Sequence, residues 1–342
     1  MTPIALEVTP ATEMDRSSER DRVKVLIITG WGRSGSTVLS NILGELDGFF
    51  SAGEVHYLWL RGVIRRLLCA CRRPVLECDV WTSVLSSPAL TDAMRGLDAE
   101  QVVAIQRDAV RMKNLRRVLG VRAGQPSGWR ELDDYRRVLN ATYIAISAET
   151  GARVIVDSSK RPINAALLRL LEDVDPYVVH LVRDPRAVAF SRRRLKMAFG
   201  RRMKQTGASQ STIKWVHRNL KAEAVRRRFP DDRSLLVRYE DFVAHPEASV
   251  KAIVALVGEE PRSWPFVHPN VVQLEPNHAV SGNQSRYRSG PIEIRADEEW
   301  RHEQKLTDRL IATACALPLL KRYGYRVRPA IARRRVQMER SS

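Results

Sequence analysis

The chain is poor in aromatic residues, in cysteine and in acidic charge. Aromatic side chains make up 6% of its 342 residues, and neither a zinc-finger nor an RNA-recognition pattern accompanies its basic charge. Proteins that bind nucleic acid combine basic charge with such motifs, so we expect no nucleic-acid partner. The 57 Lys and Arg residues outnumber the 39 Asp and Glu residues, which leaves a formal net charge of +18. This excess favours an anionic ligand or substrate, and peripheral contact with an acidic membrane surface stays open.

Long apolar runs are also missing. No window of the sequence is apolar over the length that a bilayer requires, so we expect no transmembrane helix. Acidic residues at Glu7, Glu13 and Asp15 stand where a secretory signal would be basic and then apolar. These features predict a cytoplasmic protein. The sequence does not indicate its oligomeric state.

The four cysteines are Cys69, Cys71, Cys78 and Cys315. Their spacing, Cys-x-Cys-x6-Cys for the first three, lacks the paired Cys-x2-Cys pattern of structural zinc sites. So few cysteines in a chain of this length favour reduced thiols in a cytoplasmic protein. We therefore expect no metal, and a Cys71–Cys78 disulfide stays open.

Strand-like and helix-like segments alternate along the chain. The β-branched, nearly all-apolar run at 23–29 predicts a strand buried on both faces. Further strands are predicted at 153–157, 177–182 and 234–238, and each of the four is followed by a helical pattern. Residues from about 56 to 150 predict several helices, for example over 64–71 and 135–150, and little strand. Strands that alternate with helices form βαβ units. The sequence therefore predicts an α/β fold with a P-loop-type central parallel sheet flanked by helices.

Nothing in the sequence divides the chain into separate units, because it has neither a linker rich in Pro, Gly or Ser nor a repeat of fixed period. We expect a single domain over 21–326, with a helical insertion at about 56–150. Residues 1–20 are expected to be a disordered lead-in, and residues 327–342 a basic, mobile tail. Arginine runs at 192–194, 226–228 and 333–335 are interpreted as solvated helix faces.

The segment from Gly30 to Thr37, GWGRSGST, has the spacing of a phosphate-binding loop. A predicted strand precedes it, and apolar residues at helical spacing follow it until Gly48, as expected of a loop that faces a helix N-terminus. Ser36 stands where an ATPase has lysine, which argues against ordinary ATP or GTP hydrolysis. Arg33 brings the positive charge into the loop itself, and its guanidinium suits a phosphate or phosphosulfate.

A second basic element, Arg183 to Ser191, follows the predicted strand at 177–182. Arg183 at the strand end and Ser191 in the next helix can together hold a second phosphate, one by charge and the other by its hydroxyl. GRSGST followed downstream by VRDPRAVAFS resembles the two signatures of sulfotransferases that use 3'-phosphoadenosine 5'-phosphosulfate (PAPS). The resemblance is closest to the tyrosylprotein-type and bacterial sulfotransferases, and it runs from about 23 to 305.

The resemblance implies a role for each matching residue. Loop residues would hold the 5' end of PAPS: Arg33, Ser34, Gly35, Ser36 and Thr37. Arg183 and Ser191 would hold the 3'-phosphate. Ser51-Ala52-Gly53-Glu54 is similar to a family segment whose glutamate is the general base, so Glu54 is the expected base, with His56 as the alternative. Lys160 matches a lysine that stabilises charge on the bridging oxygen.

Two later segments also resemble the family. Tyr239 matches a tyrosine near the nucleotide. The segment 281–288 precedes Trp300 much as the family's nucleotide-closing loop precedes its tryptophan, so it would contact PAPS through Ser281, Asn283 and either Arg286 or Arg288.

Together these residues predict sulfuryl transfer from PAPS to a hydroxyl or amine of an acceptor, by positioning, charge stabilisation and a base. No metal is needed. The acceptor stays open among small molecules, glycans, lipids and peptides, with Tyr57 and Trp59 as candidates for its pocket. One rival is a P-loop kinase in which Asp157, at the end of the apolar run 154–157, holds Mg²⁺. Another is a noncatalytic nucleotide- or polyanion-binding protein. His180 is expected to be a packed core histidine.

Overall fold

The computed structural model describes residues 22–194, 197–198, 201–202 and 205–327. The expected lead-in at 1–20 and the arginine run at 333–335 lie outside the described residues, as does almost all of the expected tail at 327–342. Within the described part of the chain, every helix is too short or too polar to span a bilayer.

Five parallel strands form the central sheet, in the order β2-β3-β1-β4-β7. Their bounds are β1 Val23–Gly30, β2 Phe49–Gly53, β3 Val154–Lys160, β4 Val174–Val182 and β7 Ser234–Arg238. The predicted α/β fold with a central parallel sheet is thus confirmed, and all four predicted strands are present. The edge strand β2 was not predicted.

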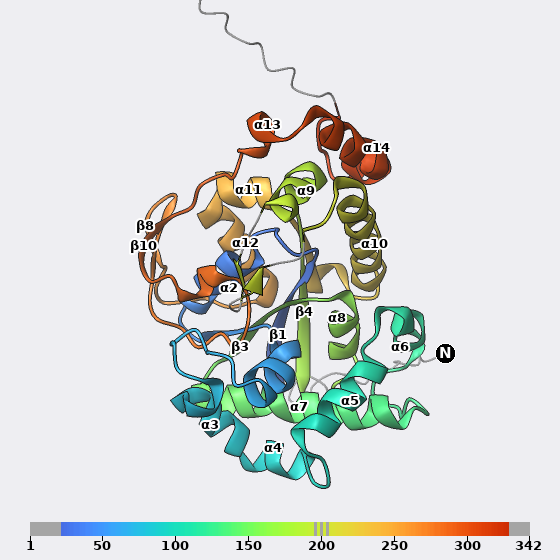
Figure 1. The fold of residues 1–342 in the computed structure, drawn as a ribbon. Helices are drawn as coiled ribbons and strands as arrows, with labels where there is room; N and C mark the ends of the chain where they lie inside the picture. The colour runs from blue at the N-terminus through green and yellow to red at the C-terminus, as the bar shows by residue number, and fades with distance from the viewer. Residues whose placement is uncertain (1–21, 195–196, 199–200, 203–204, 328–342) are drawn as a thin grey trace, which may run out of the picture.

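Helices cover both faces of this sheet (Figure 1). Leu26 and Ile28 of β1 pack in one apolar cluster with α2 (Ser36–Gly44) and α12 (Pro246–Val257). Val25 and Ile27 point to the other face and pack with α7 (Arg130–Thr150) and α8 (Pro162–Leu168). Because successive side chains of a strand point to opposite faces, a strand covered on both sides must be apolar throughout.

The segment between β2 and β3 is mostly helical and forms the lower part of the molecule in Figure 1. Its elements are η1 Val55–Tyr57, the π-helix η2 Leu58–Ile64, η3 Val75–Glu77, α3 Asp79–Ser86, α4 Pro88–Ala93, α5 Ala99–Ala109, η4 Met112–Asn114, α6 Leu115–Gly120 and α7. The helix predicted at 135–150 lies within α7. The helix predicted at 64–71 is wrong, because η2 ends at Ile64 and the chain then turns back to form an antiparallel bridge between Leu68 and Pro74.

The remaining elements lie after β4. They are α9 Pro185–Arg193, β5 Met197–Ala198, β6 Arg201–Arg202, α10 Ala208–Arg226, η5 Asp231–Arg233, α11 Tyr239–Ala244, β8 Phe266–His268, β9 Val271–Leu274, η6 Gln284–Tyr287, β10 Gly290–Glu293, α13 Trp300–Glu303 and α14 Leu306–Arg322. Strands β8, β9 and β10 form a small antiparallel sheet, and the loop 275–289 connects β9 to β10. This loop contains the predicted nucleotide-closing segment.

The helix after the phosphate-binding loop ends earlier than predicted. We expected Gly48 to end it, whereas α2 ends at Gly44. The amides of Glu45 and Leu46 bond three residues back to Ile42 and Leu43, which tightens and closes the last turn. Leu46 therefore lies beyond the helix, although it still packs in the core.

Candidate active site

The predicted functional residues gather where the five parallel strands end. The phosphate-binding loop follows β1, Glu54 follows β2, Lys160 ends β3 and Arg183 follows β4. Tyr239 follows β7 at the start of α11. Parallel strands open their carboxyl ends to one edge of the sheet, which is where α/β proteins bind ligands.

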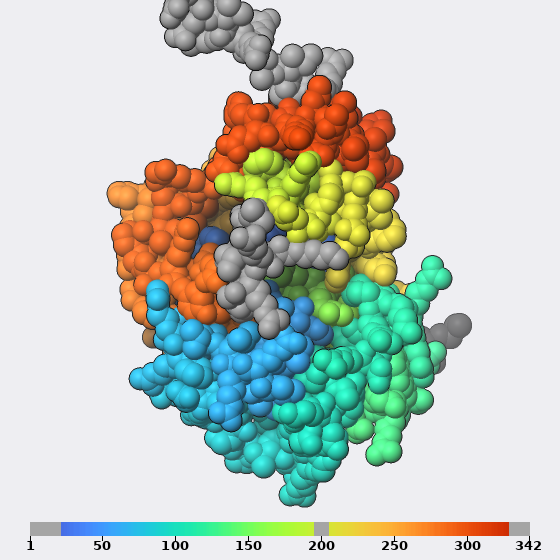
Figure 2. Space-filling model, in the orientation of Figure 1, coloured from blue at the N-terminus to red at the C-terminus, as the bar shows by residue number. Residues whose placement is uncertain are grey.

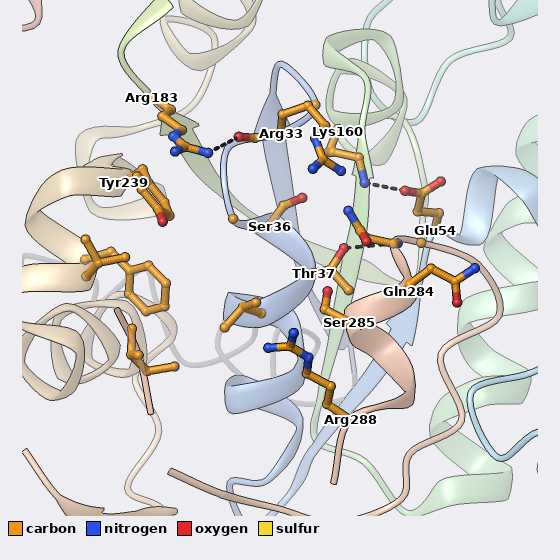
Figure 3. A pocket seen from close by; sticks show the side chains of 18 of the residues that line it. Arg33, Ser36, Thr37, Glu54, Lys160, Arg183, Tyr239, Gln284, Ser285 and Arg288 are labelled. Carbon is orange, nitrogen blue, oxygen red and sulfur yellow. Dashed lines mark hydrogen bonds and ion pairs between the residues drawn. The ribbon is translucent and has the colours of Figure 1, made fainter. Parts of the chain in front are cut away.

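A cavity of about 770 Å³ lies at this edge (Figure 3). The predicted residues that line it are Arg33, Gly35, Ser36, Thr37, Glu54, Lys160, Arg183, Tyr239, Asn283 and Arg288. Four other predicted residues are buried close by without lining it, namely Ser34, Ser191, Ser281 and Arg286. Ten of the fourteen predicted site residues thus share one cavity.

Glycines let the phosphate-binding loop pack closely against its neighbours. A Cβ on Gly30, which has φ 134°, would lie 2.3 Å from the carbonyl oxygen of Leu181. Gly35 has φ 85°, and a Cβ there would lie 2.8 Å from the ring of Tyr239. Gly35 precedes α2, whose first turn has no side-chain cap. The amides at this helix start therefore remain available to an anion in the cavity.

The two basic elements meet at the loop. The Nε of Arg33 donates to Ser191 Oγ at 3.0 Å, and a guanidinium nitrogen of Arg183 donates to the carbonyl oxygen of Arg33 at 3.0 Å. Burial, and next the charge of Arg183, lower the pKa of Arg33. Arg183 also stacks 4.3 Å from the centre of the Tyr239 ring and pairs with Asp297 at 3.1 Å. The buried guanidinium of Arg183 and the half-buried guanidinium of Arg33 both favour an anion nearby.

Glu54 faces two cations across the cavity. Its carboxylate forms ion pairs with Lys160 and, at 3.5 Å, with Arg61. Figure 3 shows the Lys160 and Glu54 side chains pointing toward one another. Arg61 also donates to Ser281 Oγ at 2.9 Å and stacks 3.6 Å from the centre of the Tyr57 ring. These contacts fix the position of the carboxylate.

His56, the alternative base, lies outside the cavity. It is buried, and burial followed by the charges of Arg161, Arg61 and Arg218 lowers its pKa to about 3. Its backbone amide donates to Ser159 Oγ, and its carbonyl accepts from Gln106. Of the two base candidates, only Glu54 lines the cavity.

Asp157 does not face the cavity either. Its carboxylate accepts hydrogen bonds from Tyr143 Oη at 2.7 Å and from the amide of Ser159 at 2.8 Å. Burial raises its pKa. A carboxylate enclosed in this way is not placed to bind the Mg²⁺ of a bound nucleotide, which removes the structural support for the kinase interpretation.

The loop 275–289 closes one side of the cavity. The backbone amide of Asn283 donates to Thr37 Oγ1 at 3.4 Å, and Asn41 of α2 donates to the carbonyl of Ser285 at 3.4 Å. Arg288 lines the cavity, whereas Arg286 is 2% exposed and donates within its own loop to the carbonyl of Gly282. Of these two arginines, Arg288 is the one that faces the cavity.

A family model for sulfotransferases matches residues 26–264. The chain belongs to the sulfotransferase family. It is therefore a transferase, and the kinase and noncatalytic alternatives lose their support. No curated protein matches the chain in sequence.

Solved sulfotransferases resemble the chain along most of its length. The sulfotransferase domain of an olefin synthase from Synechococcus PCC 7002 is 19% identical, with 90% of this chain and 96% of that chain covered and a TM-score of 0.47. The sulfotransferase domain of the curacin biosynthetic pathway is 15% identical, with 89% and 98% covered and a TM-score of 0.46. The sulfotransferase STF9 of Mycobacterium avium is 12% identical, with 92% and 80% covered and a TM-score of 0.42.

Three arginines that line this sulfotransferase's cavity were not predicted as site residues, namely Arg61, Arg192 and Arg295. Arg61 lies in the π-helix η2 and lines the cavity, and no periodicity in the sequence predicted this helix. Arg192 belongs to a run interpreted as solvated, yet it lines the cavity and stacks 4.3 Å from the centre of the Trp31 ring. Burial, and next the charge of Arg33, lower its pKa to about 10. Arg193 and Arg194 are exposed as expected, so the interpretation of the run is wrong only for Arg192. Arg192 directly follows the predicted site residue Ser191, and this position was the signal in the sequence that could have identified it.

The candidate acceptor-pocket residues separate in the structure. Tyr57 lines the cavity next to Arg61. Trp59 is 7% exposed and packs in the main apolar core instead. His180 is fully buried and hydrogen-bonds Asn219 Oδ1 at 2.9 Å, as expected of a packed core histidine.

Proposed function

We propose that this sulfotransferase takes a sulfuryl group from PAPS and transfers it in line to a hydroxyl or amine of an acceptor. The supporting observation is the meeting of two basic elements at one cavity, through the contacts of Arg33 with Ser191 and with Arg183. A donor with phosphate at both ends of its ribose needs two anion sites held at a fixed separation. A nucleotide without the 3'-phosphate would leave the second site unfilled.

The residues present fit such a donor. Arg183 and Tyr239 lie on one side of the N-terminus of α2, and Lys160 lies on the other (Figure 3). Between them, the uncapped first turn of α2 offers backbone amides. We assign Arg33 and residues 34–37 to the 5'-phosphosulfate, and Arg183 with Ser191 to the 3'-phosphate. Bound there, PAPS supplies a sulfuryl group attached to a phosphate leaving group.

Tyr239 and residues of the loop 275–289 would complete the donor site. The Arg183 guanidinium stacks on the Tyr239 ring, and this ring forms part of the cavity wall. Asn283 and Arg288 line the same cavity and are assigned to the nucleotide. Ser281 and Arg286 do not line it, so we assign them to holding Arg61 and the loop in place.

Glu54 is the proposed general base. A positioned carboxylate within hydrogen-bond reach of the acceptor hydroxyl can remove its proton as the new bond forms. Lys160, which donates to both the Glu54 carboxylate and the carbonyl oxygen of Ser158, is placed to stabilise negative charge on the departing phosphate oxygen. One ammonium thus links the base to the leaving group.

The acceptor is expected to enter beside Glu54. Tyr57, Arg61 and Gln284 line the cavity there, and Figure 3 shows Gln284 next to Glu54. An aromatic ring, a guanidinium and an amide can hold a hydroxylated compound, and they leave its class open among small molecules, glycans, lipids and peptides.

Calorimetry with PAPS and with ATP·Mg²⁺ tests the donor assignment. We expect PAPS to bind at least 100-fold more tightly, because two charged hydrogen bonds to the 3'-phosphate contribute roughly 3 kcal/mol. Turnover is then measured as release of 3'-phosphoadenosine 5'-phosphate from PAPS across a panel of hydroxylated acceptors. Tighter binding of ATP·Mg²⁺ would contradict the proposal.

A further inference from the structure

Three cysteines and one histidine meet outside the donor cavity. The Sγ atoms of Cys69, Cys71 and Cys78 and a ring nitrogen of His278 all lie within 4.8 Å of one another. Cys78 Sγ is 3.2 Å from His278 Nδ1. All four cysteines of the chain are free thiols in the structure, which excludes the Cys71–Cys78 disulfide there.

We propose that Cys69, Cys71, Cys78 and His278 bind a structural Zn²⁺ ion. Structural zinc is tetrahedral, and four ligands of the Cys₃His type close its coordination shell. From the usual Zn–S and Zn–N bond lengths, two ligand atoms on one zinc lie roughly 3.5 to 3.8 Å apart. The four ligand atoms lie at most 4.8 Å apart, which exceeds that range by about 1 Å at most. Thiolates with imidazole favour zinc over the harder magnesium and calcium ions.

A tight hairpin places the first two ligands. Leu68 and Pro74 form its bridge, and the amide of Cys69 donates to the carbonyl of Arg73 at 2.8 Å. Arg72 closes the turn with φ 70°, and its backbone amide donates to the carbonyl of Cys69. Cys69 and Cys71 therefore occupy the tip of one fixed loop, as ligand pairs in structural zinc sites do.

The other two ligands come from separate parts of the chain. Cys78 is the N-cap of α3, and its amide bonds the carbonyl of Val75. His278 lies 200 residues after Cys78. Its carbonyl oxygen accepts a hydrogen bond from Nε1 of Trp81, a residue of α3, at 2.6 Å. The carbonyl of the next residue, Ala279, accepts from the amide of Ala70 at 3.1 Å. Backbone and side-chain bonds thus hold His278 against both cysteine-bearing elements.

This arrangement explains why spacing alone predicted no metal. The rule looks for two Cys-x2-Cys pairs in one stretch of sequence. Here the Cys-x-Cys pair is completed by a capping cysteine and by a histidine from a distant loop. Only the fold brings these four residues together.

The proposed zinc joins the insertion to the loop that closes the donor cavity. In Figure 2 the light-blue surface of the insertion borders the orange surface of the late segment. Two residues after His278, the amide of Val280 donates to the carbonyl of Ala52, next to the segment that carries Glu54. Removing the ion would loosen the loop 275–289 and weaken donor binding. This consequence rests on the proposed function, whereas metal binding does not.

Metal content tests the proposal directly. The 342-residue chain, purified with a reductant and without chelator, is expected to contain one zinc per chain by inductively coupled plasma mass spectrometry. Cys78→Ser and His278→Gln should each lower zinc retention at least tenfold, since each removes one ligand of four. Cys315→Ser is the matched control, because Cys315 is an exposed thiol of α14 and should leave the zinc content unchanged. Zinc below one tenth per chain in the unaltered protein after reconstitution with ZnSO₄, or equal zinc in all variants, would overturn the site.

A spectroscopic measurement keeps the test decisive if a cysteine variant fails to fold. Co²⁺ exchanged into the unaltered protein should show the intense visible bands of a tetrahedral thiolate site, with a thiolate charge-transfer band in the near ultraviolet. Octahedral, weak Co²⁺ bands would contradict the proposal, as would a mass 2 Da below that of the reduced chain, which marks a disulfide. A zinc-loaded protein that binds no PAPS would contradict the proposed function and would still support the zinc site.

Discussion

Lys160 and Glu54 form an ion pair across the carboxyl ends of two neighbouring strands, β3 and β2. Lys160 adopts φ 65°, a left-handed conformation that costs a residue with a Cβ roughly 1 kcal/mol. Its ammonium also donates back to the carbonyl of Ser158 at 3.0 Å. Strain of this kind persists where surrounding contacts enforce it, and it gathers at functional sites. We therefore expect the negative charge of Glu54 in this pair to be required for activity.

Glu54→Gln removes that charge and keeps the shape of the side chain. We expect kcat to fall by roughly 10²- to 10⁴-fold, the usual contribution of a positioned general base. PAPS affinity should change less than about threefold, because the side-chain carboxamide oxygen of the introduced glutamine still accepts a hydrogen bond from Lys160. Calorimetry and release of 3'-phosphoadenosine 5'-phosphate separate the two quantities. Glu131→Gln, at an exposed position of α7, is the control. Unimpaired turnover would exclude Glu54 as the base.

Arg61 is predicted to position Glu54 without itself binding the donor phosphates. Arg61→Ala should lower kcat by about tenfold or more, since it removes the 3.5 Å ion pair and the bond to Ser281. Arg61→Lys should recover part of that loss by restoring the charge. Ser281→Ala removes a single hydrogen bond and should cost less. A large fall in PAPS affinity with kcat unchanged would show instead that Arg61 contacts the donor.

Arg183→Ala tests the 3'-phosphate assignment through the ligand. PAPS affinity should fall roughly 10- to 100-fold, as expected for a lost hydrogen bond to a charged group. Adenosine 5'-phosphosulfate lacks the 3'-phosphate, so its affinity should fall far less. Calorimetry with both ligands measures the difference, and Arg107→Ala, exposed on α5, serves as control. Equal losses for the two ligands would mean that Arg183 acts on the structure of the loop.

The sequence predicted four of the five strands of the central sheet, including the edge strand β7, but missed the other edge strand, β2. β1, β3 and β4 contain β-branched apolar runs, because most of their residues are buried beneath helices. β7 was recognised from the apolar residues of SLLVR, although only Val237 of this strand is buried. β2 is the short segment FFSAG, whose small residues fit beneath α2. A Cβ on Gly44 would lie 2.6 Å from Ser51, so contact between α2 and β2 depends on small side chains that carry no strand signal.

The site was predictable where function is carried by local motifs. The phosphate-binding loop, Glu54 and Lys160 each lie in a recognisable segment at a strand end. Arg61 and His278 lie in no such motif, and each has a partner far away in sequence. Arg61 reaches Ser281 across 220 residues, and His278 meets Cys78 across 200. Pairing over such distances is set by tertiary packing, which spacing rules do not describe.

Two buried histidines make stability depend on pH. Burial lowers the pKa of His180 to about 4 and that of His56 to about 3. An unfolded histidine titrates near 6.5, so below that pH the unfolded chain binds protons that the folded protein excludes. The free energy of unfolding should therefore fall as the pH is lowered from 7 to 5. The loss is on the order of 2 kcal/mol for each histidine.

His180→Gln should remove about half of this pH dependence, because glutamine carries no titrating group. The measurement is urea unfolding followed by tryptophan fluorescence at pH 7 and pH 5. His268→Gln is the matched control, since His268 is exposed on β8 and should leave the pH dependence as it is. Comparing variants at each pH cancels the buried carboxyls, such as Asp157, that titrate in all of them. If His180→Gln lost as much stability between pH 7 and 5 as the unaltered protein, proton exclusion by His180 would not be the cause.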